Sequence, residues 1–142
     1  MFSESVIDPA TVQAYLETEY LVDGAAPLTL KIGTASPQLA ALHEAHRVAS
    51  SAYVTACNPF SQVLDEVANV DRQASLKREL QARSLVFFNG VGQHPSNQWE
   101  GEASFLVLGL SLEAAKVLGG KHGQNGVVWS GLDAMPQLIL LR

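Results

Sequence analysis

Apolar residues recur along the chain at two different spacings, and these spacings predict helices interleaved with short strands. Spacing of three to four residues is typical of a helix with one buried face, and alternation or a short apolar run is typical of a strand. The predicted helices are residues 9–23, 36–47, 61–83 and 111–120. The predicted strands are residues 28–32, 51–57, 85–88, 103–110, 127–129 and 137–141.

Local signals mark where the helices begin. Asp8-Pro9 and Ser36-Pro37 each combine a capping side chain with a proline suited to the first helical position. Ser61 is the expected cap of the long third helix, and Ser111 that of the fourth. In the third helix, helical spacing predicts one core face, formed by Val63, Val67, Val70, Ala74 and Leu76 or Leu80.

The order α-β-α-β-α-β-β-α-β-β predicts an α/β fold, with α+β as the alternative. We expect one layered domain over residues 1–142, with a mixed sheet of five to six strands and about four helices. Residues 51–57, 61–83 and 84–88 are expected to form a right-handed βαβ unit. Residues 89–101 are rich in glycine and polar residues, and form the longest predicted loop.

Composition excludes several classes of protein. The single cysteine excludes a disulfide framework or a cysteine-rich zinc site, and the net charge of −5 makes nucleic-acid binding unlikely. No apolar run is long enough for a membrane span, and the acidic N-terminus is unlike a signal peptide, so we expect a cytoplasmic protein. Residues 1–30 carry five acids and no base, which is typical of a solvated face or of a surface that binds a basic partner.

Motifs for common cofactors are incomplete. Gly90-Val-Gly92 follows a strand, but Pro95 stands where a dinucleotide-binding motif needs its third glycine. His43 and His46 lie three residues apart, but no further ligand pair accompanies them. We therefore expect no cofactor and no metal.

Polar residues gather at the ends of apolar strands, and these are the candidate site. The first cluster, Thr55 to Ser61 with Asn58 at its centre, follows a strand, where ligands of open α/β sheets are bound. An ordinary turn stabilised by Asn58 and Pro59 is the alternative. Asn69 and Arg72 lie on the next helix, and Arg72 would neutralise an anionic ligand.

The second cluster begins a strand, and the third precedes one. In the second, Glu102 and Ser104 share one strand face, and Trp99 would stack on a flat ligand or cover the core. Glu102 is the candidate catalytic residue, because partial burial raises the pKa of a carboxyl and suits it to proton transfer; a solvated strand end is the alternative. In the third, Gln124 and Asn125 offer amides to a polar ligand, or form a plain turn.

Three of these motifs together resemble the bacterial family called domain of unknown function 3293. They are the run from Ala52 to Gln62, with Asn69 and Arg72 downstream; Trp99-x-x-Glu102-x-Ser104-Phe105; and Gly123-Gln124-Asn125. They occur in the expected order, and the resemblance extends over about residues 13–141. Cys57 departs from the family pattern, in which an aromatic residue is usual. The resemblance implies a small, single-domain bacterial protein and implies no activity.

Two functions follow from the sequence. The first is a domain that binds a small molecule, with catalysis left open, at a site formed by the three polar clusters. The second is a protein-interaction module without catalysis that uses the acidic N-terminal segment or an uncovered apolar face. Association of identical chains is compatible with both.

Overall fold

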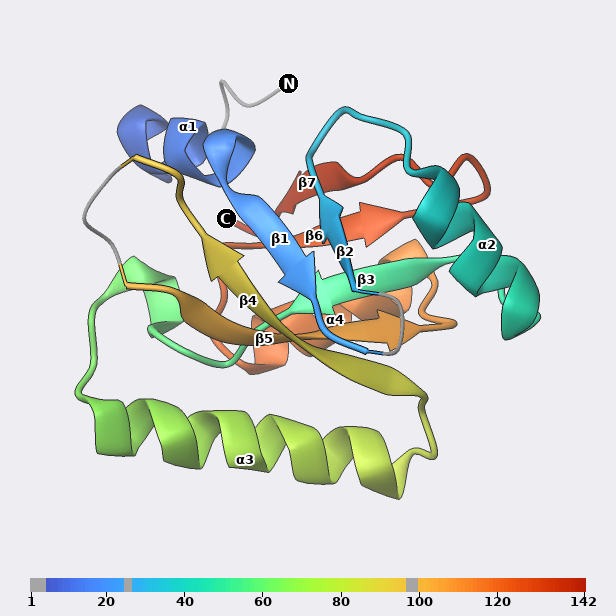
Figure 1. The fold of residues 1–142 in the computed structure, drawn as a ribbon. Coiled ribbons are helices and arrows are strands. Elements are labelled where there is room, and N and C mark those ends of the chain that lie inside the picture. The colour runs from blue at the N-terminus through green and yellow to red at the C-terminus, as the bar shows by residue number, and fades with distance from the viewer. Residues whose placement is uncertain (1–4, 25–26, 97–99) are drawn as a thin grey trace.

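The computed structural model describes residues 5–24, 27–96 and 100–142, in which four α-helices surround one curled sheet of seven strands (Figure 1). The helices are α1 (Pro9–Glu17), α2 (Pro37–Ala45), α3 (Glu66–Ala82) and α4 (Leu112–Lys121), with a short 3₁₀ helix η2 (Pro59–Ser61). The strands are β1 (Glu19–Val22), β2 (Leu28–Leu30), β3 (Ser51–Val54), β4 (Phe87–Gln93), β5 (Glu102–Leu108), β6 (Gly126–Ser130) and β7 (Gln137–Leu140).

The strands lie in the order β2-β1-β4-β5-β3-β6-β7, and every neighbouring pair is antiparallel. The fold is therefore α+β, and the predicted mixed sheet is wrong. The four helices are confirmed, with one strand more than the predicted range. That strand is β1, which the sequence pattern assigned to the end of the first helix. The backbone becomes extended at Thr18, and β1 then pairs with both β2 and β4.

The predicted βαβ unit is present only in part. Strands β3 and β4 both run antiparallel to β5, so they point the same way, and α3 connects them. They are not neighbours, because β5 lies between them. Strand β4 also continues to Gln93, so the first residues of the predicted loop 89–101 belong to the sheet.

The sheet buries side chains on both faces. Helices α3 and α4 pack on one face, against Phe105, Val107 and Val127. Helix α2 contributes Leu39 to the cluster on the other face, which includes both buried tyrosines, Tyr20 and Tyr53. The curl brings the chain after β2 close to the chain before β7, where the amide of Gly33 donates to the carbonyl of Pro136 at 2.8 Å.

The core face of α3 differs from the predicted one. Leu76 and Leu80 are fully buried, but Val67 and Val70 are 72% and 60% exposed, and Val63 precedes the helix and is 89% exposed. The inward face of the first half of α3 carries polar side chains that bind the preceding loop, as described below. This half therefore packs on a loop instead of on the sheet. None of the helices in the described ranges has the length and hydropathy needed to cross a membrane.

Candidate functional site

The three polar clusters meet at one end of the sheet. Strand β3 is antiparallel to both β5 and β6, so the point where β3 ends lies beside the points where they begin. The cluster after β3 therefore contacts the clusters before β5 and β6. We call residues 55–61, 102–104 and 123–125 together the strand-end site.

Asn58 connects the parts of this site. Its side-chain amide donates from Nδ2 to Oε2 of Glu102 at 3.0 Å, and its Oδ1 accepts from the backbone amide of Leu64 at 2.9 Å. Asn69 on α3 binds it twice, through Nδ2 to Oδ1 of Asn58 at 2.8 Å and through Oδ1 from the backbone amide of Asn58 at 2.9 Å. Asn58 and Asn69, which were both predicted to bind a ligand, are therefore bound to each other.

Arg72 and Gln124 bind backbone carbonyl groups of the loop after β3 and of the segment before β6. Arg72 donates from Nε to the carbonyl of Ala56 at 2.6 Å and from Nη2 to the carbonyl of His122 at 2.5 Å. Gln124 is buried and donates to the carbonyls of Cys57 and His122. Because these donors bind the backbone, both side chains fix the shape of the loop.

The loop holds an unusual backbone conformation. Asn58, Phe60 and Ser61 all have positive φ angles, of 46°, 55° and 58°. This region disfavours residues other than glycine by about 1–2 kcal/mol each, and asparagine tolerates it best. Such strain persists only where surrounding contacts enforce it, and it is concentrated at functional sites. Ser61 lies in η2 and does not cap α3; Asp65 does, accepting from the amide of Ala68 at 2.7 Å.

Glu102 is partly buried at the start of β5. Burial raises the pKa of its carboxyl, and the hydrogen bond from Asn58 opposes that rise. The hydrogen bond from Asn58 reaches Oε2, and no described residue donates to Oε1. The site thus contains a carboxyl group that is oriented by one neighbour and has a second oxygen available.

A second group of polar side chains lies at the outer rim of the site. The hydroxyl groups of Tyr15 and Ser61 form a short hydrogen bond, and Nδ2 of Asn125 donates to both at 3.1 Å. Arg142 donates to Oδ1 of Asn125 at 3.2 Å, and its guanidinium lies 4.5 Å from the ring centroid of Phe60. This group links α1, η2 and the start of β6.

Two further predicted site residues, Thr55 and Ser104, bind backbone carbonyl groups. Thr55 donates to the carbonyl of Ala103 at 2.7 Å, and the buried Ser104 donates to the carbonyl of Glu102 at 3.0 Å. Trp99 lies outside the described residues. The structure brings the other nine predicted residues, namely Thr55, Asn58, Ser61, Asn69, Arg72, Glu102, Ser104, Gln124 and Asn125, into one connected region.

Sequence reasoning missed three residues of this region: Tyr15, Gln73 and Arg142. Tyr15 lies on α1, far from the polar clusters in the sequence. Gln73 lies four residues after Asn69, so the two share a helix face. Its Oε1 accepts from the amide of Ala56 at 3.0 Å, and its Nε2 is the buried side-chain nitrogen that has no partner among the described residues. The spacing of Asn69 and Gln73 was the available signal.

The cysteine and the histidine pair, which were considered as a nucleophile or as metal ligands, do not form a common site. Cys57 is buried, and burial raises the pKa of its thiol. His43 is buried against Ser51, with Nε2 2.8 Å from the hydroxyl, whereas the ring of His46 contacts Phe88. In the described ranges, no three His, Cys, Asp or Glu side chains come together as metal ligands do.

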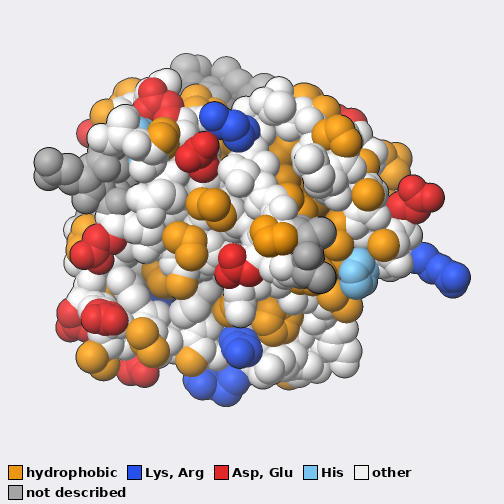
Figure 2. Space-filling model, viewed as in Figure 1, with side chains coloured by type: hydrophobic (Ala, Val, Ile, Leu, Met, Phe, Trp, Pro, Cys, Tyr) orange, Lys and Arg blue, Asp and Glu red, His pale blue; other side chains and the backbone are white. Residues whose placement is uncertain are grey.

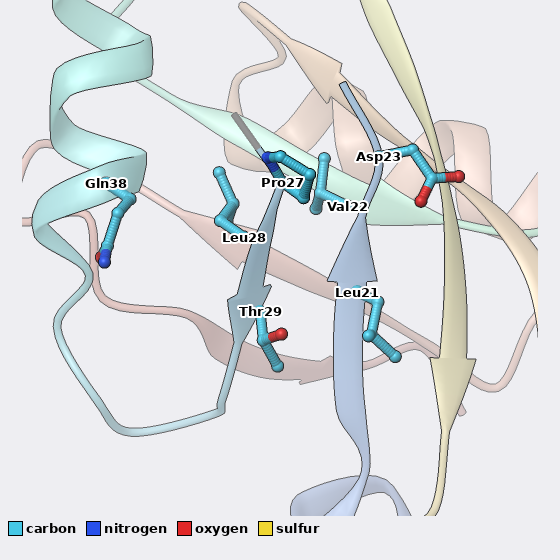
Figure 3. Close-up of a pocket in the computed structure, with 7 residues that line it drawn as sticks. All are labelled: Leu21, Val22, Asp23, Pro27, Leu28, Thr29 and Gln38. Carbon is cyan, nitrogen blue, oxygen red and sulfur yellow. The ribbon is translucent and has the colours of Figure 1, made fainter. Parts of the chain in front are cut away.

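Two surface hollows lie outside the strand-end site. The larger, of about 380 Å³, lies between β1, β2 and the start of α2, with Asp23 and Gln38 on opposite sides (Figure 3). The other, of about 180 Å³, lies beside His43 and Leu132. In the acidic segment, Asp8 caps α1 and Glu17 binds His94 at 3.0 Å, so two of its acids already have local partners.

The fold and the site define a small α+β protein with a polar site where three antiparallel strands begin or end. A family model described as "Protein of unknown function (DUF3293)" matches residues 54–127, which is just over half of the chain. The chain belongs to this family, and every predicted site residue lies within the matched range. No curated protein and no solved structure matches the chain.

Proposed function

We propose that this protein binds a small polar molecule at the strand-end site and that Glu102 is the group that recognises it. The observation that carries this proposal is the carboxyl of Glu102, whose Oε2 is held by Asn58 and whose Oε1 has no donor among the described residues. A partly buried carboxyl oxygen without a donor gains a hydrogen bond when a ligand supplies the donor. The strained loop that orients Asn58 is the second support.

The chemistry of a carboxyl group narrows the class of ligand. When ionised, Glu102 accepts only, so it selects a ligand with N–H or O–H donors, such as an amine, an amide or a sugar hydroxyl. Its raised pKa also suits it to take a proton from such a ligand and return it. Proton transfer by Glu102 is therefore the catalytic version of this proposal. We also propose that this is a bacterial protein of the cytoplasm.

A thermal-shift panel of nucleotides, sugar phosphates, amino acids and divalent metals tests this function. A ligand at about 100 times its Kd adds ~2.7 kcal/mol of stability, which corresponds to roughly 6–10 °C for a domain of this size. We expect a shift with the wild-type protein and its loss in Glu102→Gln. The matched control is Glu113→Gln on α4, where the side chain is 82% exposed. A shift that survives in Glu102→Gln would place the ligand elsewhere, and no shift with any compound would contradict the function.

The raised pKa of Glu102 also predicts a pH-dependent stability. A carboxyl whose pKa is higher in the folded state contributes stability below its unfolded pKa, near 4.5, and this contribution is lost as pH rises through the folded value. Glu102→Gln resembles the protonated form and keeps an oxygen for Asn58. We therefore expect the wild type to lose stability relative to Glu102→Gln between about pH 4 and pH 7.

Urea denaturation of both proteins at the two pH values measures this difference. Glu113→Gln is again the control, and it should change stability by less than about 0.5 kcal/mol at either pH. A gap between wild type and Glu102→Gln that stays constant with pH would contradict the proposed environment of Glu102.

A further inference from the structure

Helix α3 presents an apolar stripe to solvent. Within the helix, Val67, Val70 and the half-buried Ala74 follow one another at intervals of three and four residues, which is the seam spacing of paired helices, and Val63 lies just before the helix. The three valines are 89%, 72% and 60% exposed. Figure 1 shows α3 along one border of the molecule, with its outer side uncovered by any other helix or strand. Exposed valines are otherwise unfavourable here, because β-branched residues lower helix propensity.

The charges beside this stripe are separated along the helix. Glu66 and Asp71 lie in its first half, and Lys77 and Arg78 lie in its second half; all four are exposed. None of the four forms an ion pair with a described residue. Figure 2 shows acidic side chains near one end of α3 and basic side chains further along, with hydrophobic side chains between them.

The helix dipole does not account for this separation. The dipole favours acids in the first turn and bases in the last turn, and its effect fades beyond those turns. It explains Glu66, but Asp71, Lys77 and Arg78 lie further inside the helix Glu66–Ala82. These three charges need another explanation.

We propose that α3 is the contact surface of a homodimer, in which two copies of the chain pair their α3 helices antiparallel about a two-fold axis. Such an axis sets the acidic first half of each helix against the basic second half of the other. The crossing point then lies near the small Ala74, and Val67 and Val70 of each helix lie against the second half of the other, beside the aliphatic stems of its basic side chains. A parallel arrangement would set like charges together. This surface is separate from the strand-end site, and the proposal does not depend on a ligand.

Charge reversal with a complementary pair of variants tests this dimer. Lys77→Glu/Arg78→Glu makes the outer face of α3 acidic throughout, and Glu66→Lys/Asp71→Lys makes it basic throughout. We expect sedimentation to show a concentration-dependent dimer for the wild type, a monomer for each variant alone, and a heterodimer when the two are mixed. Circular dichroism establishes that each variant is folded, which we expect for changes at exposed positions.

A hydrophobic variant and its control complete the test. Val70→Lys should abolish the dimer, because it adds a base beside the basic half of the partner helix, and Val117→Lys, at a 71% exposed position on α4, should leave it unchanged. A wild type that stays monomeric up to about 1 mM would overturn the proposal. So would a dimer that persists in Val70→Lys, or charge variants that fail to associate when mixed. A monomer that loses another bound protein on Val70→Lys would assign the surface to a different partner, and would overturn the proposal too.

Discussion

Asn58→Ala is expected to destabilise the protein by roughly 3 kcal/mol. The change removes the acceptor for the amides of Leu64 and Asn69 and the donor to Glu102. Partly buried partners left without a hydrogen bond cost about 1–3 kcal/mol each, although the losses do not simply add. Alanine also tolerates the positive φ of 46° less well than asparagine does. Urea denaturation at neutral pH measures the effect.

Two other substitutions at this position separate the loss of hydrogen bonds from the backbone strain as causes of the destabilisation. Asn58→Gly loses the same hydrogen bonds without the backbone penalty, so it should be less harmful than alanine by about 1 kcal/mol. Asn58→Asp keeps the acceptor but puts a second carboxyl beside Glu102, and their repulsion grows as both ionise. Its stability should therefore fall further as pH rises. Equal stability of the alanine, glycine and wild-type proteins would show that the hydrogen bonds of Asn58 do not hold the loop.

Leu76→Ala is expected to lower the free energy of unfolding by about 2–5 kcal/mol, because it leaves a cavity in the core. Leu76 is fully buried and packs in the cluster between α3, α4 and the sheet. The matched control is Val67→Ala on the same helix, where the side chain is 72% exposed. We expect that change to stay within about 0.5 kcal/mol.

Chemical denaturation measures the free energy of unfolding of both variants. Unchanged m values would show that the unfolding transition is the same. The low protein concentration used for such measurements keeps any association through α3 from adding to the stability of Val67. A loss at Val67 as large as the loss at Leu76 would contradict the orientation of α3 in this structure.

Local sequence signals predicted most of the elements correctly. The prolines and capping residues at Asp8 and Ser36 mark the starts of α1 and α2, and alternation in residues 28–32 marks β2. These signals are local because a cap or a strand face depends on residues a few positions apart. The end of α1 was misjudged, because β1 is stabilised by β2 and β4, its partners in the sheet.

The position of α3 shows a second limit of local reasoning. Its valines and its leucines both recur at helical spacing, so the sequence offers two apolar faces. The inward face was decided by Asn69, Arg72 and Gln73, which bind a loop formed by residues 11 to 17 positions earlier. Hydrogen bonds across that separation depend on how the chain returns to itself, and periodicity carries no information on this.

The order of residues along the chain already shows that polar groups stand at the ends of apolar strands, and that Glu102 begins one of them. That these groups meet follows from the folded chain, because the antiparallel pairing of β3 with β5 and β6 brings the end of one strand beside the starts of two others. The partners of Glu102 also follow from that pairing. Asn58 lies 44 residues away in the chain, yet its amide nitrogen is 3.0 Å from the carboxyl.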